Sequence, residues 1–161
     1  MQIENLNING VNIPHRVVPI VADGACLFRA LSYVIYGRQN LDRELRKRIV
    51  DHVIERWSQF SIMSHDSYGN NYANANAYYA DMSQSNTYGG LCELTAAGQL
   101  FELIFEVYRN GKLYAKFGNE GNPIRRLRFT NNLSSGHFDV YLQYESVSPT
   151  HSSDMPYYHY E

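Results

Sequence analysis

The sequence predicts an α+β fold in which a small, mostly antiparallel sheet is flanked by helices. Its 161 residues are 44% hydrophobic and 19% charged, which is enough apolar material for one compact core. Segments with helical spacing of apolar residues come first, and short strand-like segments joined by turn residues come later. No internal repeat interrupts this order. We therefore expect one folded domain over residues 17–145, between an N-terminal arm (1–16) and a mobile C-terminal tail (146–161).

The chain begins with an Asn-rich polar stretch, residues 1–15, which we interpret as a strand or a loose arm. The apolar run VVPIV (17–21) is broken by Pro19, which favours an edge strand or a lead-in to the fold. Asp23-Gly24 then makes a turn.

Three helices are expected. The first runs from Cys26 to Tyr36 and ends at Gly37, a typical C-cap. The second is capped by Asn40 and runs from Leu41 to about Phe60. The third covers residues 91–100. The apolar residues that define the first two helical faces are Leu27, Phe28, Leu31, Val34 and Ile35, then Leu45, Ile49, Val53, Trp57 and Phe60.

Between the second and third helices lies a stretch rich in Asn, Ser, Tyr and Gly, residues 61–90. We expect a long loop with one helical turn near 78–84. Loops of this length are uncommon in compact domains and are often functional, although a merely tolerated insertion explains the composition too.

The remaining segments indicate strands. Residues 103–108 are one strand, and Asn110-Gly111 is a strong hairpin signal that returns the chain as KLYAKFG. Residues 124–130 and 137–144 are two more strands, joined by a turn over 131–136.

The overall charge excludes some functions. The net charge is −2, whereas nucleic-acid binders usually carry a basic field, so we expect no nucleic-acid partner. The basic clusters at 43–48 and 125–128 are small, and we interpret both as solvated faces. No apolar run approaches the ~20 residues that span a bilayer, so we expect no membrane span.

The two cysteines cannot build a disulfide framework or a structural zinc site. They fit a reducing, intracellular, cytoplasmic setting, and the first ten residues do not look like a signal peptide. We expect a monomer that needs no metal and no cofactor.

One of those cysteines, Cys26, stands where a turn becomes a helix. Thiolates are favoured at a helix N-terminus, where free N–H groups and the helix dipole stabilise negative charge. The backbone N–H groups of Ala25 and Cys26 would point into the same space, and with the backbone of Gly24 they could hold an oxyanion. Gly24 would keep the turn open to a substrate backbone.

A thiolate needs a base, and His137 is the best candidate among six histidines because it begins a strand after a turn. Asp139 lies two residues further on, so both side chains point to the same face of that strand. Asp139 can bind one ring nitrogen and leave the other for the thiol. Phe138, Val140 and Leu142 would then face the core.

Each of these residues also has an ordinary explanation. Cys26 could be a small core residue, Asp23 a plain helix cap, His137 a polar residue at a strand end and Asp139 a surface acid. Taken singly, none of them establishes a catalytic site.

Taken together, DGACLFRAL (23–31) and GHFDVY (136–141) resemble the ovarian tumour (OTU) family of cysteine proteases. LRKRIVDHVIERW (45–57) is similar to the family's helix after the nucleophile, and YADMSQ with TYGGLCELTAAGQLF (87–101) is similar to its Trp-Gly-Gly segment. The similarity spans about residues 17–144.

The resemblance implies an OTU-like, papain-like cysteine protease fold. It also implies hydrolysis of isopeptide bonds, and of peptide bonds as well, at the C-terminal Gly of ubiquitin or polyubiquitin. Cys26 becomes the nucleophile, His137 the general base and acid, and Asp139 the residue that orients His137. Asp23 matches an acid of the family's active site, and whether Asp23 or Asp139 is the main third residue stays open. Gly89 and Gly90, with Tyr88, are candidate substrate-binding residues.

Two departures from the family pattern stand out. Ala25 replaces the common Asn before the cysteine, which leaves the backbone N–H unchanged, and Tyr88 replaces the common Trp. The Asn- and Tyr-rich composition slightly favours a microbial or pathogen setting, such as a bacterial or viral effector in the host cytosol.

Other readings of the same residues are an OTU-fold binding module and a protease for a ubiquitin-like modifier. A metalloenzyme would use His137 and Asp139 with another histidine such as His151 or His159. A redox pair of Cys26 with Cys92 lacks a Cys-x-x-Cys motif.

Overall fold

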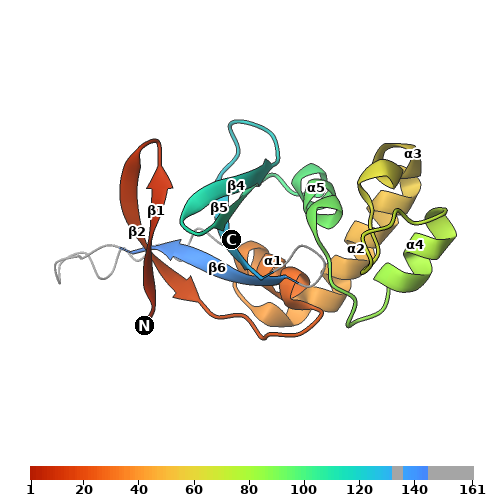
Figure 1. The fold of residues 1–161 in the computed structure, drawn as a ribbon, viewed down its shortest axis with the longest axis horizontal. Helices are drawn as coiled ribbons and strands as arrows, with labels where there is room; N and C mark the ends of the chain where they lie inside the picture. The colour runs from red at the N-terminus through yellow and green to blue at the C-terminus, as the bar shows by residue number, and fades with distance from the viewer. Residues whose placement is uncertain (132–135, 145–161) are drawn as a thin grey trace.

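A curled six-stranded sheet packs against a group of helices (Figure 1). The structure, a computed structural model, describes residues 1–131 and 136–144. The strands are β1 (Ile3–Ile8), β2 (Val11–Val18), β3 (Ile104–Arg109), β4 (Lys112–Phe117), β5 (Ile124–Thr130) and β6 (His137–Gln143). The α-helices are α1 (Cys26–Tyr36), α2 (Asp42–Glu55), α3 (Trp57–Phe60), α4 (Ala75–Met82) and α5 (Leu91–Leu100), with 3-10 turns η1 (Gln39–Leu41) and η2 (Ser61–Met63).

The strand order is β1-β2-β6-β5-β3-β4. Neighbouring strands are antiparallel except β3 and β5, which are parallel. The predicted α+β class with a mostly antiparallel sheet is therefore confirmed.

The polar N-terminal segment belongs to this sheet. It forms the β1–β2 hairpin, whose turn residues Asn9 and Gly10 have φ of 54° and 82°. The expected boundary between residues 16 and 17 falls inside β2, which pairs with β6 from His15 to Val18. The curl of the sheet also brings β1 to the β3–β4 turn, where the Asn7 N–H donates to the Gly111 carbonyl at 2.8 Å.

The helix that begins at Cys26 matches its predicted bounds and ends at Gly37, with φ of 81°. The second predicted helix is broken instead. Its backbone leaves the helical region at Arg56 (φ −122°), which separates α2 from α3, and Asn40 lies in η1 while Leu41 occupies the N-cap of α2. The apolar spacing could not reveal this break, because Phe60 is buried on the same side in spite of it.

Residues 61–90 contain more structure than one turn. Helix α4 is capped by Asn74, whose side chain accepts the Ala77 N–H at 2.8 Å. Before it, the Asp66 carboxylate accepts the N–H groups of Tyr68 and Asn70. The segment is thus internally hydrogen-bonded, and α5 follows with the predicted bounds.

The strands near the C-terminal side agree closely with the sequence. Asn110 and Gly111 both have positive φ (53° and 77°), as the predicted tight hairpin requires. Most of the turn expected at 131–136, and the tail expected at 146–161, lie outside the described residues. None of the helices in the described part is long and apolar enough to cross a bilayer.

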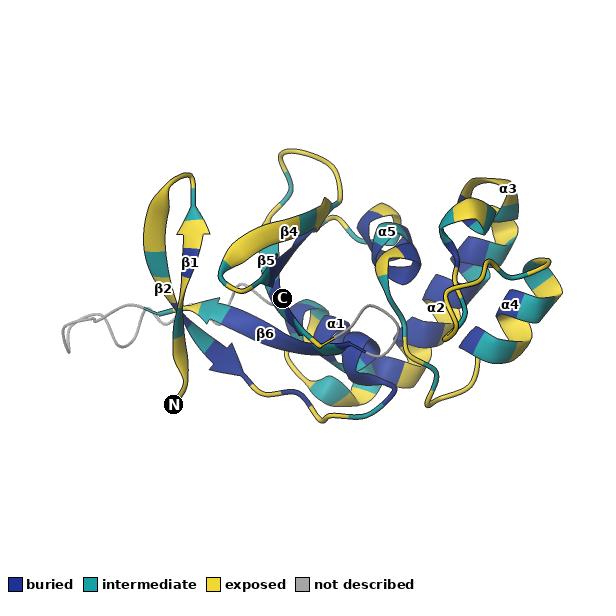
Figure 2. Cartoon of the chain, viewed as in Figure 1, coloured by how far each residue is buried: buried dark blue, intermediate teal, exposed yellow. Residues whose placement is uncertain are grey.

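Strands β3 and β6 are buried on both faces, whereas β1 and β4 are largely exposed (Figure 2). One face packs on the helices, with Phe138 and Val140 of β6 in the main core, as predicted. The other face lies inside the curl and contains a second apolar cluster made of Leu6, Val17, Tyr108 and Tyr141. Strand β6 is therefore held from both sides, which fixes the residues at its start.

Candidate active site

Cys26 is the first residue of α1 and is only 1% exposed. Its thiol donates a hydrogen bond to the Gly136 carbonyl, with 3.5 Å between sulfur and oxygen. Burial raises the pKa of the Cys26 thiol, and the Asp23 and Asp139 carboxylates add to the rise, although N–H groups of Phe138 and Leu27 oppose it. The helix N-terminus was expected to lower the pKa of Cys26, but burial outweighs that effect, so Cys26 is a neutral thiol in this conformation.

The predicted histidine–carboxylate pair is formed. The Nε2 atom of His137 lies 2.8 Å from Oδ1 of Asp139, which accepts a hydrogen bond from the ring. Asp139 is 6% exposed and is held further by the Ile20 N–H at 2.9 Å and by Nη1 of Arg128 at 3.1 Å. With Nε2 bound to the carboxylate, Nδ1 is the ring nitrogen that remains for a thiol.

The structure brings Cys26 and His137 to the same place. The two backbone groups at the Cys26 sulfur, the Gly136 carbonyl and the Phe138 N–H, belong to the residues on either side of His137. Residues more than a hundred positions apart in sequence thus meet where α1 and β6 begin.

Asp23 does not cap α1 through its side chain. The N-cap is Ala25, without a side-chain capping bond. The Asp23 carboxylate accepts the Ala25 N–H at 3.0 Å and pairs with Arg29 at 3.1 Å. Burial works against ionisation of Asp23, but the bonds from Arg29 and Ala25 outweigh it and lower the pKa of this carboxyl.

The expected oxyanion donors are therefore engaged within the turn. Besides the Ala25 N–H on the Asp23 carboxylate, the Cys26 N–H donates to the Asp23 carbonyl at 3.1 Å. The space at Gly24 is also filled, because a β-carbon there would lie 1.7 Å from the Asn86 carbonyl oxygen. Gly24 admits the protein's own backbone, whereas the sequence suggested that it leaves room for a substrate.

Arg46 holds that approaching segment in place, a role that the sequence did not indicate. Its guanidinium is buried and donates to the carbonyls of Gly24, Met82, Ser85 and Thr87 at 2.8–3.4 Å. It also lies 4.1 Å from the centre of the Phe28 ring. The 43–48 cluster is thus not simply a solvated face: Arg46 joins the nucleophile turn to residues 82–87.

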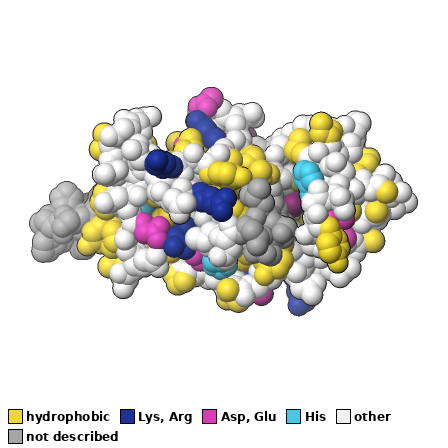
Figure 3. All heavy atoms as spheres, in the orientation of Figure 1, with side chains coloured by type: hydrophobic (Ala, Val, Ile, Leu, Met, Phe, Trp, Pro, Cys, Tyr) yellow, Lys and Arg dark blue, Asp and Glu magenta, His cyan; other side chains and the backbone are white. Residues whose placement is uncertain are grey.

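The second basic cluster is also structural. Arg126 pairs with Glu106 and Arg128 with Glu4 and Asp139, each near 3 Å, inside the curl of the sheet. The interpretation as a solvated face was wrong, because the alternation of these arginines puts them opposite carboxylates from other strands. On the surface in Figure 3, described basic side chains lie interspersed with acidic ones.

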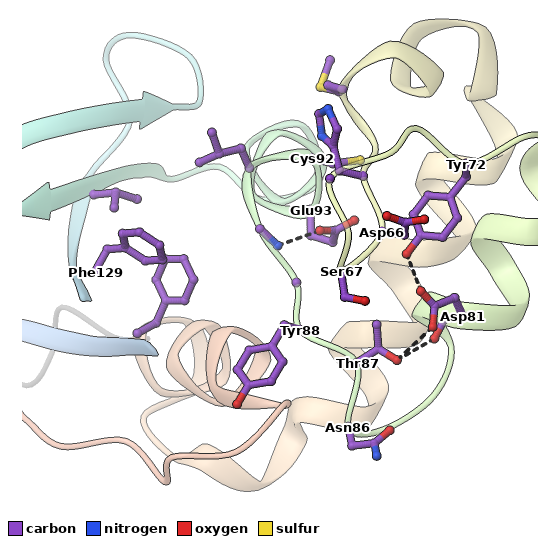
Figure 4. Close-up of a pocket in the computed structure, with 18 of the residues that line it drawn as sticks. Asp66, Ser67, Tyr72, Asp81, Asn86, Thr87, Tyr88, Cys92, Glu93 and Phe129 are labelled. Atoms are coloured by element: carbon purple, nitrogen blue, oxygen red, sulfur yellow. Dashed lines mark hydrogen bonds between the residues drawn. The ribbon is translucent and has the colours of Figure 1, made fainter. Parts of the chain in front are cut away.

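A pocket of about 610 Å³ opens beside this site. The predicted Tyr88, Gly89 and Gly90 line it, together with Phe138 next to His137. Figure 4 shows Phe129 on its sheet side and Asp66, Tyr72 and Asp81 on its helical side. A β-carbon on Gly89 would come within 2.9 Å of Leu27, so this wall packs directly on the start of α1.

Glu93 anchors the glycine segment. This fully buried carboxylate accepts the Gly90 N–H and the Tyr78 hydroxyl, each at 2.7 Å. Burial raises the pKa of Glu93 in spite of these bonds. Its neighbour Cys92 is a free, buried thiol, as is Cys26.

For a metal site, the described residues offer no group of three His, Cys, Asp or Glu side chains placed to hold an ion. His151 and His159, the histidines that a metal reading would use, lie outside the described residues.

A thiol at a helix start, beside a strand that begins with a His–Asp pair, is the side-chain set of a cysteine protease. The sequence model of the family described as "OTU-like cysteine protease" matches residues 21–147. The chain belongs to this family.

Curated relatives agree with that assignment. The chain is 27% identical over 142 residues to OTU domain-containing protein 1 of Mus musculus and of Homo sapiens. The match covers 83% of this chain but only 30% and 28% of those proteins, so the chain spans about three-tenths of their length. OTU domain-containing protein 5-A of Danio rerio is 30% identical over 110 residues, 64% of this chain and 18% of that protein.

Solved structures confirm the predicted OTU-like fold. The OTU domain of OTUD1 superposes with a TM-score of 0.67 and 24% identity, covering 80% of this chain and 86% of that one. An OTU domain in complex with ubiquitin superposes with a TM-score of 0.64 and 19% identity, covering 97% of this chain and 87% of that one. An OTU deubiquitinase from Wolbachia pipientis wMel bound to ubiquitin superposes with a TM-score of 0.59 and 16% identity, covering 80% of this chain and 96% of that one.

Proposed function

We propose that this chain is a deubiquitinating cysteine protease that hydrolyses isopeptide bonds, and peptide bonds, at the C-terminal Gly of ubiquitin. The observation that carries the proposal is the meeting of the Cys26 thiol with the start of β6, where His137 is already bound to Asp139. One structural neighbour described as an OTU deubiquitinase, and further OTU domains solved with ubiquitin, support this substrate class.

In this mechanism His137 takes the Cys26 proton on Nδ1, and the sulfur attacks the carbonyl carbon of the terminal glycine. The tetrahedral intermediate collapses to a thioester as His137 gives its proton to the leaving lysine amine. A water molecule, deprotonated by His137, then attacks the thioester and frees the ubiquitin carboxylate and the Cys26 thiol. Asp139 keeps the ring oriented throughout.

Two hydrogen bonds must be exchanged before attack. The Cys26 thiol must turn from the Gly136 carbonyl to His137, and the Ala25 N–H must pass from the Asp23 carboxylate to the developing oxyanion. Arg29 remains paired with Asp23 after the Ala25 N–H has left the carboxylate. Asp23 thus determines whether the Ala25 N–H is free to bind the oxyanion, while Asp139 is the third member of the catalytic group.

The pocket beside Gly89 and Gly90 is the proposed path of the ubiquitin tail. A β-carbon on Gly90 would meet nothing within 4 Å, so its surface is open for an extended peptide to approach. We also propose that the enzyme works in a reducing intracellular setting, because its nucleophile must remain a free thiol.

The test is cleavage of diubiquitins of each linkage and of a fluorogenic ubiquitin C-terminal amide. We expect release of monoubiquitin or dye by the wild type, with a loss of at least about a thousandfold in Cys26→Ser and in His137→Gln. A folded wild type that cleaves none of these substrates, or a Cys26→Ser variant with full activity, would overturn the proposal.

A further inference from the structure

The catalytic histidine is connected by side chains to the N-terminal strand. Arg128 on β5 lies directly opposite Asp139 on β6, and its Nη1 donates to Oδ2 at 3.1 Å. The Nε atom of the same guanidinium donates to both carboxylate oxygens of Glu4 on β1, at 3.1 and 3.0 Å. A continuous chain therefore runs from Glu4 through Arg128 and Asp139 to His137.

Glu4 is itself firmly held. Besides Arg128, the Tyr141 hydroxyl donates to Oε1, and Nε2 of Gln2 donates to Oε2 at 2.7 Å. Burial opposes ionisation of Glu4, but the bonds from Arg128 and Tyr141 outweigh it and lower the pKa of this carboxyl. Glu4 is thus an anion at neutral pH with its orientation fixed by three neighbours.

This arrangement depends on the curl of the sheet. Strand β1 is separated from β5 by two strands in the pairing order, so a flat sheet would keep Glu4 away from Arg128. The bond from Asn7 to Gly111 closes the curl and holds β1 over the concave face. The family match begins at residue 21 and does not account for this contact.

We propose that Glu4 and Arg128 are positioning residues of the active site, so that the β1–β2 hairpin helps to hold His137 in its reactive orientation. The inference rests on the proposed function for the identity of the reaction. Arg128 donates to Oδ2 of Asp139, whereas His137 uses Oδ1. By binding Nε of the same guanidinium, Glu4 holds it in the orientation in which Nη1 can reach Asp139. Without Glu4, Arg128 can turn away and Asp139 loses one of its constraints.

A neighbouring pair provides the matched control. Arg126 also lies on β5 and donates through Nε to a buried carboxylate, Glu106, at 3.1 Å. Its guanidinium is as shielded as that of Arg128, with side chains 20% and 23% exposed. Arg126 is bonded to Glu106, His15 and Tyr108, and none of these three residues bonds Asp139. Loss of Arg126 thus reports what a buried ion pair contributes to stability alone.

The experiment compares wild type with Glu4→Gln, Glu4→Ala, Arg128→Gln and Arg126→Gln. For each variant we would measure the unfolding midpoint, kcat and KM on a ubiquitin C-terminal substrate, and the rate at which iodoacetamide alkylates Cys26. Alkylation is quantified on the Cys26 peptide by mass spectrometry and needs no ubiquitin. A merely structural loosening exposes the buried thiol and speeds alkylation, whereas a displaced His137 slows it, so the two roles have opposite signs.

We expect kcat to fall at least about fivefold in Arg128→Gln and Glu4→Ala with KM unchanged, and Cys26 alkylation to slow in parallel. Glu4→Gln keeps an acceptor for Arg128 and should lie between Glu4→Ala and wild type. Arg126→Gln should lower the unfolding midpoint and leave kcat at the wild-type value, and it should speed Cys26 alkylation or leave it unchanged rather than slow it.

Wild-type kcat in Glu4→Ala would overturn the inference, as would an equal fall of kcat in Arg126→Gln or faster alkylation in the Glu4 and Arg128 variants. If Arg128→Gln does not fold, the two Glu4 variants decide the matter. If the wild type cleaves no ubiquitin substrate, the proposed function fails, and the alkylation rates still decide whether Glu4 and Arg128 position His137.

Discussion

The carbonyl oxygen of Asn86 lies against Gly24, so close that a β-carbon on this glycine would stand 1.7 Å away from it. The nucleophile turn and the segment that lines the substrate pocket therefore pack backbone to backbone. Side chains that touch neither Cys26 nor a substrate can consequently control the geometry of this site.

Gly24→Ala should separate these two segments. The added methyl cannot be accommodated by a side-chain rotation, because its neighbour is backbone, and we expect a loss of about 3 kcal/mol or more in unfolding free energy. Urea denaturation measures the loss, and activity should fall with it. Wild-type stability in Gly24→Ala would contradict the observed packing.

Gly90→Ala is the matched substitution on the pocket wall. Nothing lies within 4 Å of its added carbon and its φ of −153° is outside the left-handed region, so stability should change by less than about 1 kcal/mol. Since the methyl would project into the proposed path of the ubiquitin tail, KM should rise. If neither stability nor KM changes in Gly90→Ala, the ubiquitin tail does not pass beside Gly90.

Arg46→Lys should destabilise the fold although the charge is kept. A single ammonium cannot reach the four carbonyls that the guanidinium binds, and we expect a loss of roughly 2–4 kcal/mol. Thermal and urea unfolding would measure it. The exposed Arg43 on the same helix is the control, and Arg43→Lys should be neutral.

Glu93→Gln should change how stability depends on pH. Because burial raises the pKa of Glu93 in the folded protein, its contribution to stability is complete below its unfolded value of 4.5 and is lost as pH rises through the folded value. The stability of wild type minus that of Glu93→Gln should therefore decrease as pH rises. A difference that grows with pH across urea titrations would contradict the direction of this shift.

Much of the site could be predicted from the sequence because its signals are local. The start of α1 at Cys26 follows from helical spacing, and the shared face of His137 and Asp139 follows from the period of a strand. The turn at Asn110-Gly111 is likewise set by its own residue types.

Other features depend on contacts between distant segments. Arg46 and Arg128 look like surface charges in the sequence, and only the fold shows the carbonyls around one and the two carboxylates beside the other. Nothing near Glu4 indicates that the sheet curls far enough to bring it to Arg128. The buried, neutral state of Cys26 also depends on the packing of β6 against α1, because the helix N-terminus alone would favour the thiolate.

The most direct test of the central claim is the intact mass of the protein after incubation with ubiquitin that carries a cysteine-reactive C-terminal warhead. We predict one added ubiquitin on wild type, mapped to Cys26 by peptide analysis, and none on Cys26→Ala, which should still bind ubiquitin. No adduct on folded wild type, or an adduct that forms at Cys92 or persists in Cys26→Ala, would contradict the account of a ubiquitin-directed protease with Cys26 as its nucleophile.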